Sequence, residues 1–201
     1  DDGIIIEGLK IEYFKDKSLI IVSQGKISKI DINIEIQSNT IKYNIKDGKI
    51  YFTNKVKIND KKNDLVINSD QITYDLSNRK IFGKGNNKII DEFNNIYRLS
   101  EFEYSIKDKI IKLNNTKVFD RNENTFELEI AFLDLNKKEI VAKDIGLNFK
   151  ISENSENEPR LKGRSLISDE KNTIVEKGTF TFCKKRDKCP PWEMSAKEIR
   201  H

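Results

Sequence analysis

Two cysteines near the C-terminal end are the residues of this chain best suited to a specific chemistry. Cys183 and Cys189 flank a charged stretch, and the only tryptophan, Trp192, follows a pair of prolines. A structural zinc site needs four ligands, and the only histidine is His201. A disulfide is therefore favoured over zinc, either between these two cysteines or from one of them to another segment, and two free thiols are the remaining alternative.

The sequence offers little else for catalysis. It has one histidine, no glycine-rich phosphate loop and no pairing of a nucleophile with a base, so we expect no enzyme, no cofactor and no metal. Its 37 basic and 33 acidic residues give a net charge of +4 and are interleaved along the chain. A nucleic-acid-binding protein is expected to cluster basic residues with surface aromatics, so we expect no nucleic-acid partner.

The composition predicts an ordered all-β protein. Hydrophobic residues make up 36% of the chain and are mostly isoleucine, phenylalanine, tyrosine and valine, with only 3 prolines and 9 glycines. Residues of these types favour strands. No apolar run approaches the roughly 20 residues that a membrane-spanning helix needs, so we expect either a cytosolic protein or a mature chain whose signal peptide has been removed.

A short sequence motif of the form apolar-x-Tyr recurs through most of the chain. Its third position falls at Tyr13, Tyr43, Tyr74 and Tyr104 and, as leucine, at Leu133, at intervals of 30, 31, 30 and 29 residues. A steady interval of this length is the signature of a stacked internal repeat. We therefore expect most of the chain to form one array of similar units.

Each repeat is predicted to be a bent antiparallel hairpin. Turn residues follow the motif in each repeat, as in Lys46-Asp47-Gly48, and this turn is called the first turn of the repeat. Apolar residues alternate with polar ones along the strands, as from Ile50 to Ile58. The apolar parity switches at mid-strand, as it does across Ser69-Asp70. We interpret each switch as a bend or bulge.

A meander of bent hairpins places two half-sheets face to face with their apolar sides inward. The interior is then either a closed β-sandwich core or an open wedge, and periodicity does not separate the two. The polar run from Ser152 to Pro159 is predicted to be an exposed loop. A last hairpin is expected from Leu161 to Phe182, turning over Asp169–Asn172.

The tandem apolar-x-Tyr-Asp repeats with Asn and Lys turns resemble the OstA-like domains of lipopolysaccharide transport proteins. The run from Gly178 to Cys183, followed by the run from Trp192 to His201, resembles the junction before the outer-membrane barrel in the LptD branch of that family. The resemblance implies an OstA-like β-jellyroll, an open V-shaped stack of bent antiparallel strands.

The resemblance also implies a domain organisation and a function. Residues 1–182 would form the jellyroll domain, and residues 183–201 a cysteine-containing junction that leads toward an outer-membrane β-barrel. The domain would lie at the periplasmic face of the outer membrane, receive lipopolysaccharide from an LptA-type bridge protein and pass it to its own barrel and an LptE-type plug. The alternatives are the bridge protein itself and a ligand-free structural β-repeat module of a cell-surface protein.

The family pattern further implies a disulfide from Cys183 to a cysteine of the barrel. Cys189 and the Pro190-Pro191 pair depart from that pattern. They leave open whether Cys189 pairs with Cys183 or forms a second bond to the barrel.

Acyl chains leave water favourably, at roughly 25 cal/mol per Å² of apolar area, so apolar residues turned inward are the candidate lipid contacts. These candidates are Phe52, Val56, Ile58, Ile72, Phe82, Ile89, Phe102, Leu113, Val118, Ile145, Leu147 and Phe149. We expect about half of them to touch lipid.

The first strand of an open stack has one unpaired edge, to which a strand of a partner protein can be added. We predict that this edge docks the bridge protein. Its candidate residues are Ile4, Ile5, Ile6, Leu9 and Ile11.

Overall fold

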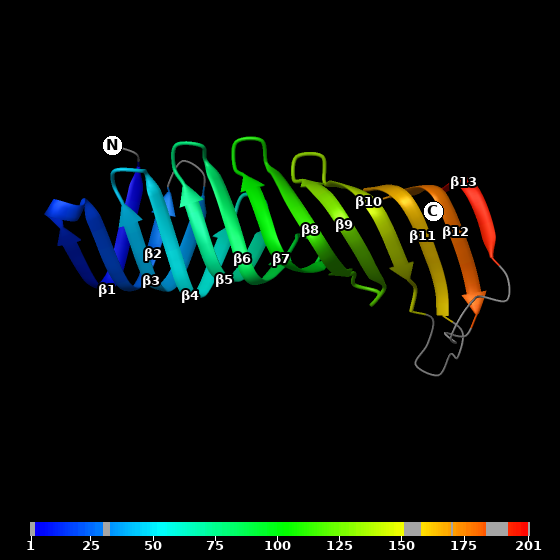
Figure 1. Ribbon diagram of the computed structural model, residues 1–201, viewed down its shortest axis with the longest axis horizontal. Coiled ribbons are helices and arrows are strands. Elements are labelled where there is room, and N and C mark those ends of the chain that lie inside the picture. The colour runs from blue at the N-terminus through cyan, green and yellow to red at the C-terminus, as the bar shows by residue number, and fades with distance from the viewer. Residues whose placement is uncertain (1–2, 30–32, 151–157, 170, 184–192, 201) are drawn as a thin grey trace. The chain divides into compact units, whose positions relative to one another are not determined.

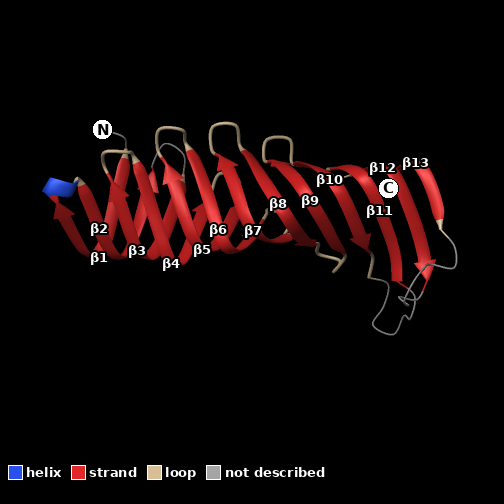
Figure 2. Cartoon of the chain, viewed as in Figure 1, coloured by secondary structure: helices blue, strands red, loops and turns tan. Residues whose placement is uncertain are grey.

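The computed structural model describes residues 3–29, 33–150, 158–169, 171–183 and 193–200. Thirteen antiparallel strands form a single sheet in which every strand lies beside its sequence neighbours, from β1 to β13 (Figures 1 and 2). The predicted all-β fold class is confirmed.

The strands are of similar length. They are β1 (Ile4–Phe14), β2 (Leu19–Lys29), β3 (Ile34–Asn44), β4 (Lys49–Asp60), β5 (Leu65–Asp75), β6 (Lys80–Ile90), β7 (Ile96–Ser105), β8 (Ile110–Phe119), β9 (Thr125–Asp134), β10 (Glu139–Asn148), β11 (Glu158–Ser168), β12 (Thr173–Cys183) and β13 (Met194–Arg200). A single 3-10 turn, η1 (Lys15–Lys17), joins β1 to β2. Within these described ranges no helix is long and apolar enough to cross a membrane.

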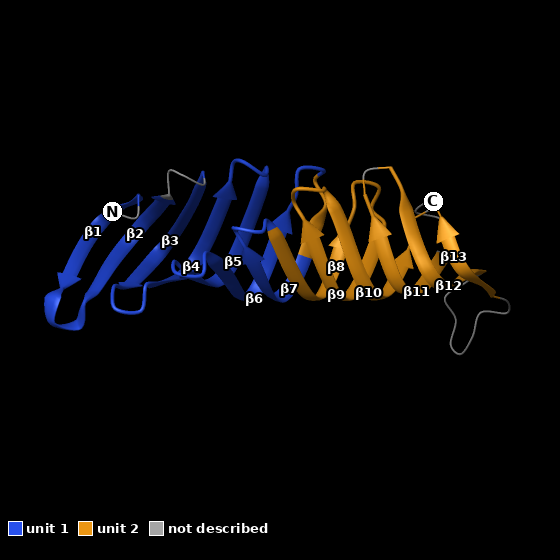
Figure 3. Ribbon diagram, turned by 90° about the horizontal axis from the view of Figure 1, so that it is seen from above, with its two compact units in different colours: residues 1–93, 98–109 blue, residues 94–97, 110–201 orange. Residues whose placement is uncertain are grey.

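The chain forms two compact units (Figure 3). Unit 1 comprises residues 1–93 and 98–109, and unit 2 comprises residues 94–97 and 110–201. Each unit has its own buried apolar residues, such as Ile50 and Phe52 in unit 1 and Leu113 and Leu128 in unit 2.

The repeat is visible in the backbone as a recurring turn residue. Ser18, Gly48, Arg79, Lys109 and Lys138 all have positive φ, between 48° and 64°. They follow one another at intervals of 30, 31, 30 and 29 residues, which are the same intervals as those of the apolar-x-Tyr motif. A left-handed residue closes each tight turn, so the predicted first turns are confirmed.

The predicted bends are confirmed at mid-strand. Positive φ recurs there at Gln24, Asn54, Gly85, Asn115 and Asp144. The pairings of β3 with β4, β4 with β5 and β5 with β6 each shift register near the same level. An extra residue on one strand bends that strand and increases its twist, so the bulges bend neighbouring strands at matching places.

The inward-facing residues of β4 are apolar on both sides of its bulge. Ile50 and Phe52 are buried before the bulge, and Val56 and Ile58 are buried after it. Between Thr53 and Val56, β4 has one residue more than the segment of β5 that pairs with it, from Ser69 to Gln71. Tyr51 lies on the opposite face and is 38% exposed.

The last predicted hairpin is confirmed, with one difference. Strands β11 and β12 pair across the expected turn, where the Asp169 backbone N–H donates to Asn172 O at 3.0 Å. Glu158 and Pro159, expected in the preceding loop, instead lie in β11, where Pro159 is opposite Phe182 and its carbonyl accepts the Phe149 N–H at 3.0 Å. The rest of the predicted loop, residues 152–157, lies outside the described residues.

Candidate functional site

The apolar interior of each unit is the first candidate site, because it holds most of the predicted lipid contacts. In unit 1 these are Phe52, Val56, Ile58, Ile72, Ile89 and Phe102, and in unit 2 they are Leu113, Val118, Ile145 and Leu147. All ten side chains are buried. The structure therefore places them in packed interiors, and their contact with lipid stays a prediction.

The other two predicted contacts are placed differently. Phe82 is 39% exposed and lies on the opposite face of β6 from the buried Ile81. The reason lies at the next residue, where a Cβ on Gly83 would come within 1.9 Å of the Phe102 ring. The ring of Phe102 thus fills the inward space beside Gly83. Ile81 and Gly83 are the inward-facing residues of this part of β6, and Phe82 between them faces outward. Phe149 is only partly buried.

Buried polar side chains line the bend of unit 1. Ser38 Oγ lies 2.6 Å from Thr53 O and accepts the Thr40 N–H at 3.1 Å. Ser69 Oγ donates to Asn87 Oδ1 at 2.6 Å, and the Asn87 amide donates in turn to backbone carbonyls of β7. A bulge leaves backbone groups without their ladder partners, so these side chains satisfy polar groups that the bend would otherwise bury.

Successive first turns are joined by backbone hydrogen bonds. The Ile45 N–H donates to Ser18 O at 2.9 Å, the Leu76 N–H to Gly48 O at 3.1 Å, and the Ile106 N–H to Arg79 O at 3.0 Å. The acceptors Ser18, Gly48 and Arg79 are the left-handed turn residues. These bonds run along the side of unit 1 that the first turns form, which is called the rim below, and they connect each repeat to the next.

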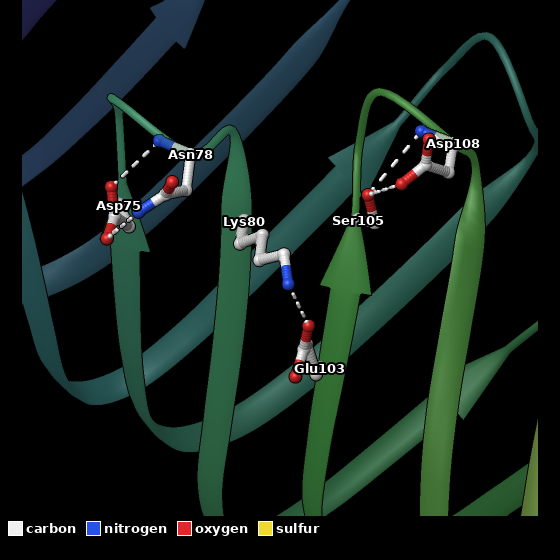
Figure 4. A network of polar contacts seen from close by, with 6 residues as sticks. All are labelled: Asp75, Asn78, Lys80, Glu103, Ser105 and Asp108. Atoms are coloured by element: carbon white, nitrogen blue, oxygen red, sulfur yellow. Dashed lines mark hydrogen bonds and ion pairs between the residues drawn. The ribbon is translucent and has the colours of Figure 1, made fainter.

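Side chains reinforce the same rim (Figure 4). Asp75 accepts both the backbone N–H and the side-chain amide of Asn78 at 3.0 Å, and these bonds hold the pKa of Asp75 below its usual value. Lys80 Nζ donates to Glu103 Oε1 at 2.6 Å, which raises the pKa of Lys80. Figure 4 also shows Ser105 Oγ donating to Asp108.

One polar contact crosses the interior of unit 1. Tyr104 on β7 donates its hydroxyl hydrogen to Asp60 Oδ2 at the end of β4, at 2.6 Å. Asn63 donates to Asp60 at 2.6 Å and to Tyr104 Oη at 3.2 Å. Strands β4 and β7 are three positions apart in the sheet, so the contact requires the two half-sheets to face one another. Burial raises the pKa of Tyr104 well above its usual value, and the bond to Asp60 raises it further.

The predicted docking strand β1 lies at one end of the sheet and pairs only with β2. Leu9 is 79% exposed, Ile5 and Ile11 are also exposed, and Ile4 and Ile6 are partly buried. Strand β1 therefore has the free edge that strand addition requires. The docking of a partner there stays a prediction.

The cysteine junction falls mostly outside the described residues. The backbone of Cys183 ends β12 opposite Glu158, whereas Cys189 and Trp192 lie in the undescribed stretch 184–192. The predicted disulfide stays untested. Over the part of the chain that the structure describes, no group of three or more His, Cys, Asp or Glu residues is placed to hold a metal ion.

Sequence reasoning did not find a polar groove of about 1000 Å³ in unit 1. Its lining comes from the middle of β1 to β6, at the level of the bulges, and is mainly lysine, asparagine, glutamine and serine. Val56 is the only predicted lipid contact in this lining. The signal in the sequence was a lysine two or three residues after each of the first three bends, at Lys26, Lys57 and Lys88.

No protein-family model and no curated protein sequence matches the chain. Among solved structures, the chain is similar to LptH, described as the LptA homologous periplasmic component of the conserved lipopolysaccharide transport device from Pseudomonas aeruginosa. The sequence identity is 11% and the TM-score is 0.49, and the likeness covers 55% of this chain and 81% of that chain. The strand pairing of this chain by itself gives the all-β architecture.

Proposed function

We propose that this protein carries lipopolysaccharide across the periplasm by enclosing its acyl chains between the two half-sheets. The observation that supports this most directly is the apolar inner face that the bent strands present from one repeat to the next. Burial of apolar carbon provides about 0.8 kcal/mol per CH₂ group. It requires no directional bonds, so acyl chains of different lengths are accepted and can slide along the interior.

The ligand enters where the two half-sheets move apart at the ends of their strands. Each strand passes from one half-sheet to the other at its bend, so the bends keep the half-sheets connected. The turn-to-turn hydrogen bonds run along the rim of turns on one side only. In unit 1 the Tyr104–Asp60 hydrogen bond spans the interior. Acyl chains would displace contacts among the buried side chains without breaking the strand ladder.

The finer proposal assigns the chain to the barrel-bearing component of the transport system. An LptA-type bridge protein would add a strand to the free edge of β1 and deliver lipopolysaccharide. The chain would pass it to its own outer-membrane barrel and an LptE-type plug at the periplasmic face of the outer membrane. Cys183 would form a disulfide with the barrel or with Cys189. These assignments follow from the sequence resemblance of the cysteine junction.

Two other functions remain as alternatives. The chain could be the bridge protein itself, since that protein shares the repeats. It could instead be a structural module with a permanently filled core, an alternative that the burial of ten predicted lipid contacts favours. Sequencing the gene beyond His201 distinguishes the bridge protein from the barrel-bearing component, because only the barrel-bearing component continues into a long series of membrane strands.

Site-specific photocrosslinking in cells tests lipid binding. A photoreactive residue at Phe52 or Phe102 is expected to form adducts with lipopolysaccharide, because both side chains point into the interior of unit 1. Tyr51 is the matched control, since it neighbours Phe52 on β4 but lies on the other face. Adducts at the interior positions and not at Tyr51 support transport. Their absence from every interior position supports the structural module.

A further inference from the structure

The polar groove of unit 1 contains a row of side chains that are aligned across six strands. In the sheet, Glu7 pairs with Lys26, Lys26 with Gln37, Gln37 with Lys57, Lys57 with Asn68, and Asn68 with Lys88. All six line the groove. Directly paired residues project from the same face of a sheet, so β1 to β6 each contribute one side chain to a continuous row.

The row has a regular chemical pattern. Lysines stand on alternate strands at Lys26, Lys57 and Lys88, and carboxamides stand between them at Gln37 and Asn68. Neighbouring strands lie about 4.8 Å apart, so successive lysines of the row start about 10 Å apart. The pattern follows from the repeat, because the lysines are separated by 31 residues each.

Two of the three lysines have no partner within the described structure. Lys26 Nζ lies 2.9 Å from a carboxylate oxygen of Glu7 and is neutralised by it. Lys57 and Lys88 form no ion pair or hydrogen bond with any described residue, and Asn68 likewise leaves its amide unengaged. The side-chain amide of Gln37 donates one hydrogen bond to Glu35 Oε1 at 2.7 Å, which leaves its second N–H group for a ligand. The groove therefore has cationic and amide groups that are available to a ligand.

The lining also limits the kind of ligand. It contains no aromatic side chain, although binding of single-stranded nucleic acid usually depends on aromatic platforms for the bases. Carboxamides donate and accept hydrogen bonds together, which suits the hydroxyl groups of sugars. Sugars of an extended polysaccharide follow one another at a spacing similar to that of strands in a sheet, so one sugar can face each strand.

We propose that this row binds an extended acidic polysaccharide that has an acidic group on every second sugar. The acidic groups lie at Lys57 and Lys88, and the hydroxyls of the intervening sugars bond to Gln37 and Asn68. The site is independent of the proposed transport function, because the residues of the row are distinct from the inward apolar residues. A soluble glycan without acyl chains therefore tests this site alone.

The test is calorimetric titration of the whole chain with a hyaluronan octasaccharide, which has a carboxylate on alternate sugars. The wild-type protein should bind it saturably, and added salt should weaken the binding through screening. Replacing both free lysines, Lys57→Gln with Lys88→Gln, should weaken binding about tenfold or more through loss of two charge-assisted hydrogen bonds. Replacing the carboxamides, Gln37→Ala with Asn68→Ala, should also weaken it while leaving the charge unchanged.

The matched control is Lys42→Gln with Lys107→Gln, which removes the same charge from exposed lysines of unit 1 outside the groove lining. This variant should bind as the wild type does, and thermal unfolding should show all three variants folded. A neutral cello-oligosaccharide of the same length should bind much more weakly than hyaluronan.

Three results would overturn the proposal. The first is the absence of saturable hyaluronan binding, and the second is an equal loss of affinity in the groove variant and its control, which would indicate a solvated cationic surface only. The third is tighter binding of a thymidine oligonucleotide than of hyaluronan, with the same dependence on Lys57 and Lys88, which would assign the groove to nucleic acid.

Discussion

Tyr104 shows how one side chain joins the two half-sheets of unit 1. Its ring is buried in the interior, and its hydroxyl reaches a carboxylate that is buried at the end of β4. Asp60 also accepts the backbone N–H groups of Lys62 and Asn63 at 3.1 and 3.2 Å. A buried carboxylate is stable only when hydrogen bonds replace its hydration, so Tyr104 and the turn after β4 depend on one another.

Replacing Tyr104 by phenylalanine should destabilise the fold by about 1–3 kcal/mol, because a buried acceptor loses one of its donors. Tyr51→Phe on the exposed face of β4 is the control and should change stability little. Urea denaturation of the two variants measures the difference. Equal stability of Tyr104→Phe and the wild type would show that the hydrogen bond across the interior contributes nothing.

The raised pKa of Tyr104 predicts a pH dependence as well. Above the usual tyrosine pKa of about 10, the unfolded chain loses this proton while the folded chain retains it. The stabilisation is therefore complete below that pH and is lost as pH rises further. Denaturation at increasing alkaline pH should show a shallower fall in stability for Tyr104→Phe than for the wild type, and parallel curves would contradict the prediction.

Gly83 is a position where even one methyl group should be costly. A Cβ there would lie 1.9 Å from Phe102 Cε1, so Gly83→Ala forces the buried ring out of its place. Overpacking of this kind costs about 1–3 kcal/mol. Gly146→Ala is the control, since its Cβ would meet no atom closer than 3.9 Å. Thermal unfolding should rank Gly83→Ala well below the wild type and Gly146→Ala close to it.

Among the elements, β1 differs from β2 to β12 because only one of its two edges is paired. It is also the strand with the most exposed apolar side chains, including Leu9, Ile11 and Tyr13. An exposed apolar edge strand invites pairing with another chain. The strand therefore has the backbone and the side chains that the proposed docking of a bridge protein requires.

Proline at Ile5 should weaken the capture of an LptA-type bridge protein in a pull-down, because proline lacks the N–H group and disrupts an added strand. The fold should persist, as measured by circular dichroism, since β1 is at the edge. Lys197→Pro in β13, the strand at the other end of the sheet, is the matched control and should leave capture unchanged. Undiminished capture by Ile5→Pro would assign docking to another surface.

The described strands form an array in which each strand pairs only with its sequence neighbours. In such arrays stability is approximately a sum over repeats and their nearest-neighbour interfaces. Strands β3 and β5 are equivalent along the array, because each has inward apolar residues on both sides of a buried serine, Ser38 or Ser69. A full period should therefore be removable without loss of the fold.

Deletion of residues 45–75 removes one period of 31 residues and joins the end of β3 directly to the turn that follows β5. The shortened chain should keep a β-sheet circular dichroism spectrum and a cooperative thermal transition at a lower midpoint. Deletion of residues 45–60 is the control, because it removes β4 and the turn before it and so reverses the direction of every later strand. Loss of cooperativity in both deletions would contradict the independence of the repeats.

The local sequence determined the repeat interval, the strands, the turns and the bends. Each depends on residues that are close together in the chain, such as the turn at Gly48 or the change of parity across Ser69-Asp70, where backbone sterics and side-chain alternation act directly. The inward placement of Phe52 and Ile58 could be predicted for the same reason, and it is confirmed by their burial.

Only the tertiary structure decided which side chains meet across strands. On β6 the ring of Phe102 occupies the inward space beside Gly83, so Gly83 faces inward and its neighbour Phe82 faces outward. The Tyr104–Asp60 bond joins residues 44 positions apart, and the row from Glu7 to Lys88 depends on five successive registers. Each bulge shifts the register of the next pairing, and such shifts accumulate over distances that no local pattern records.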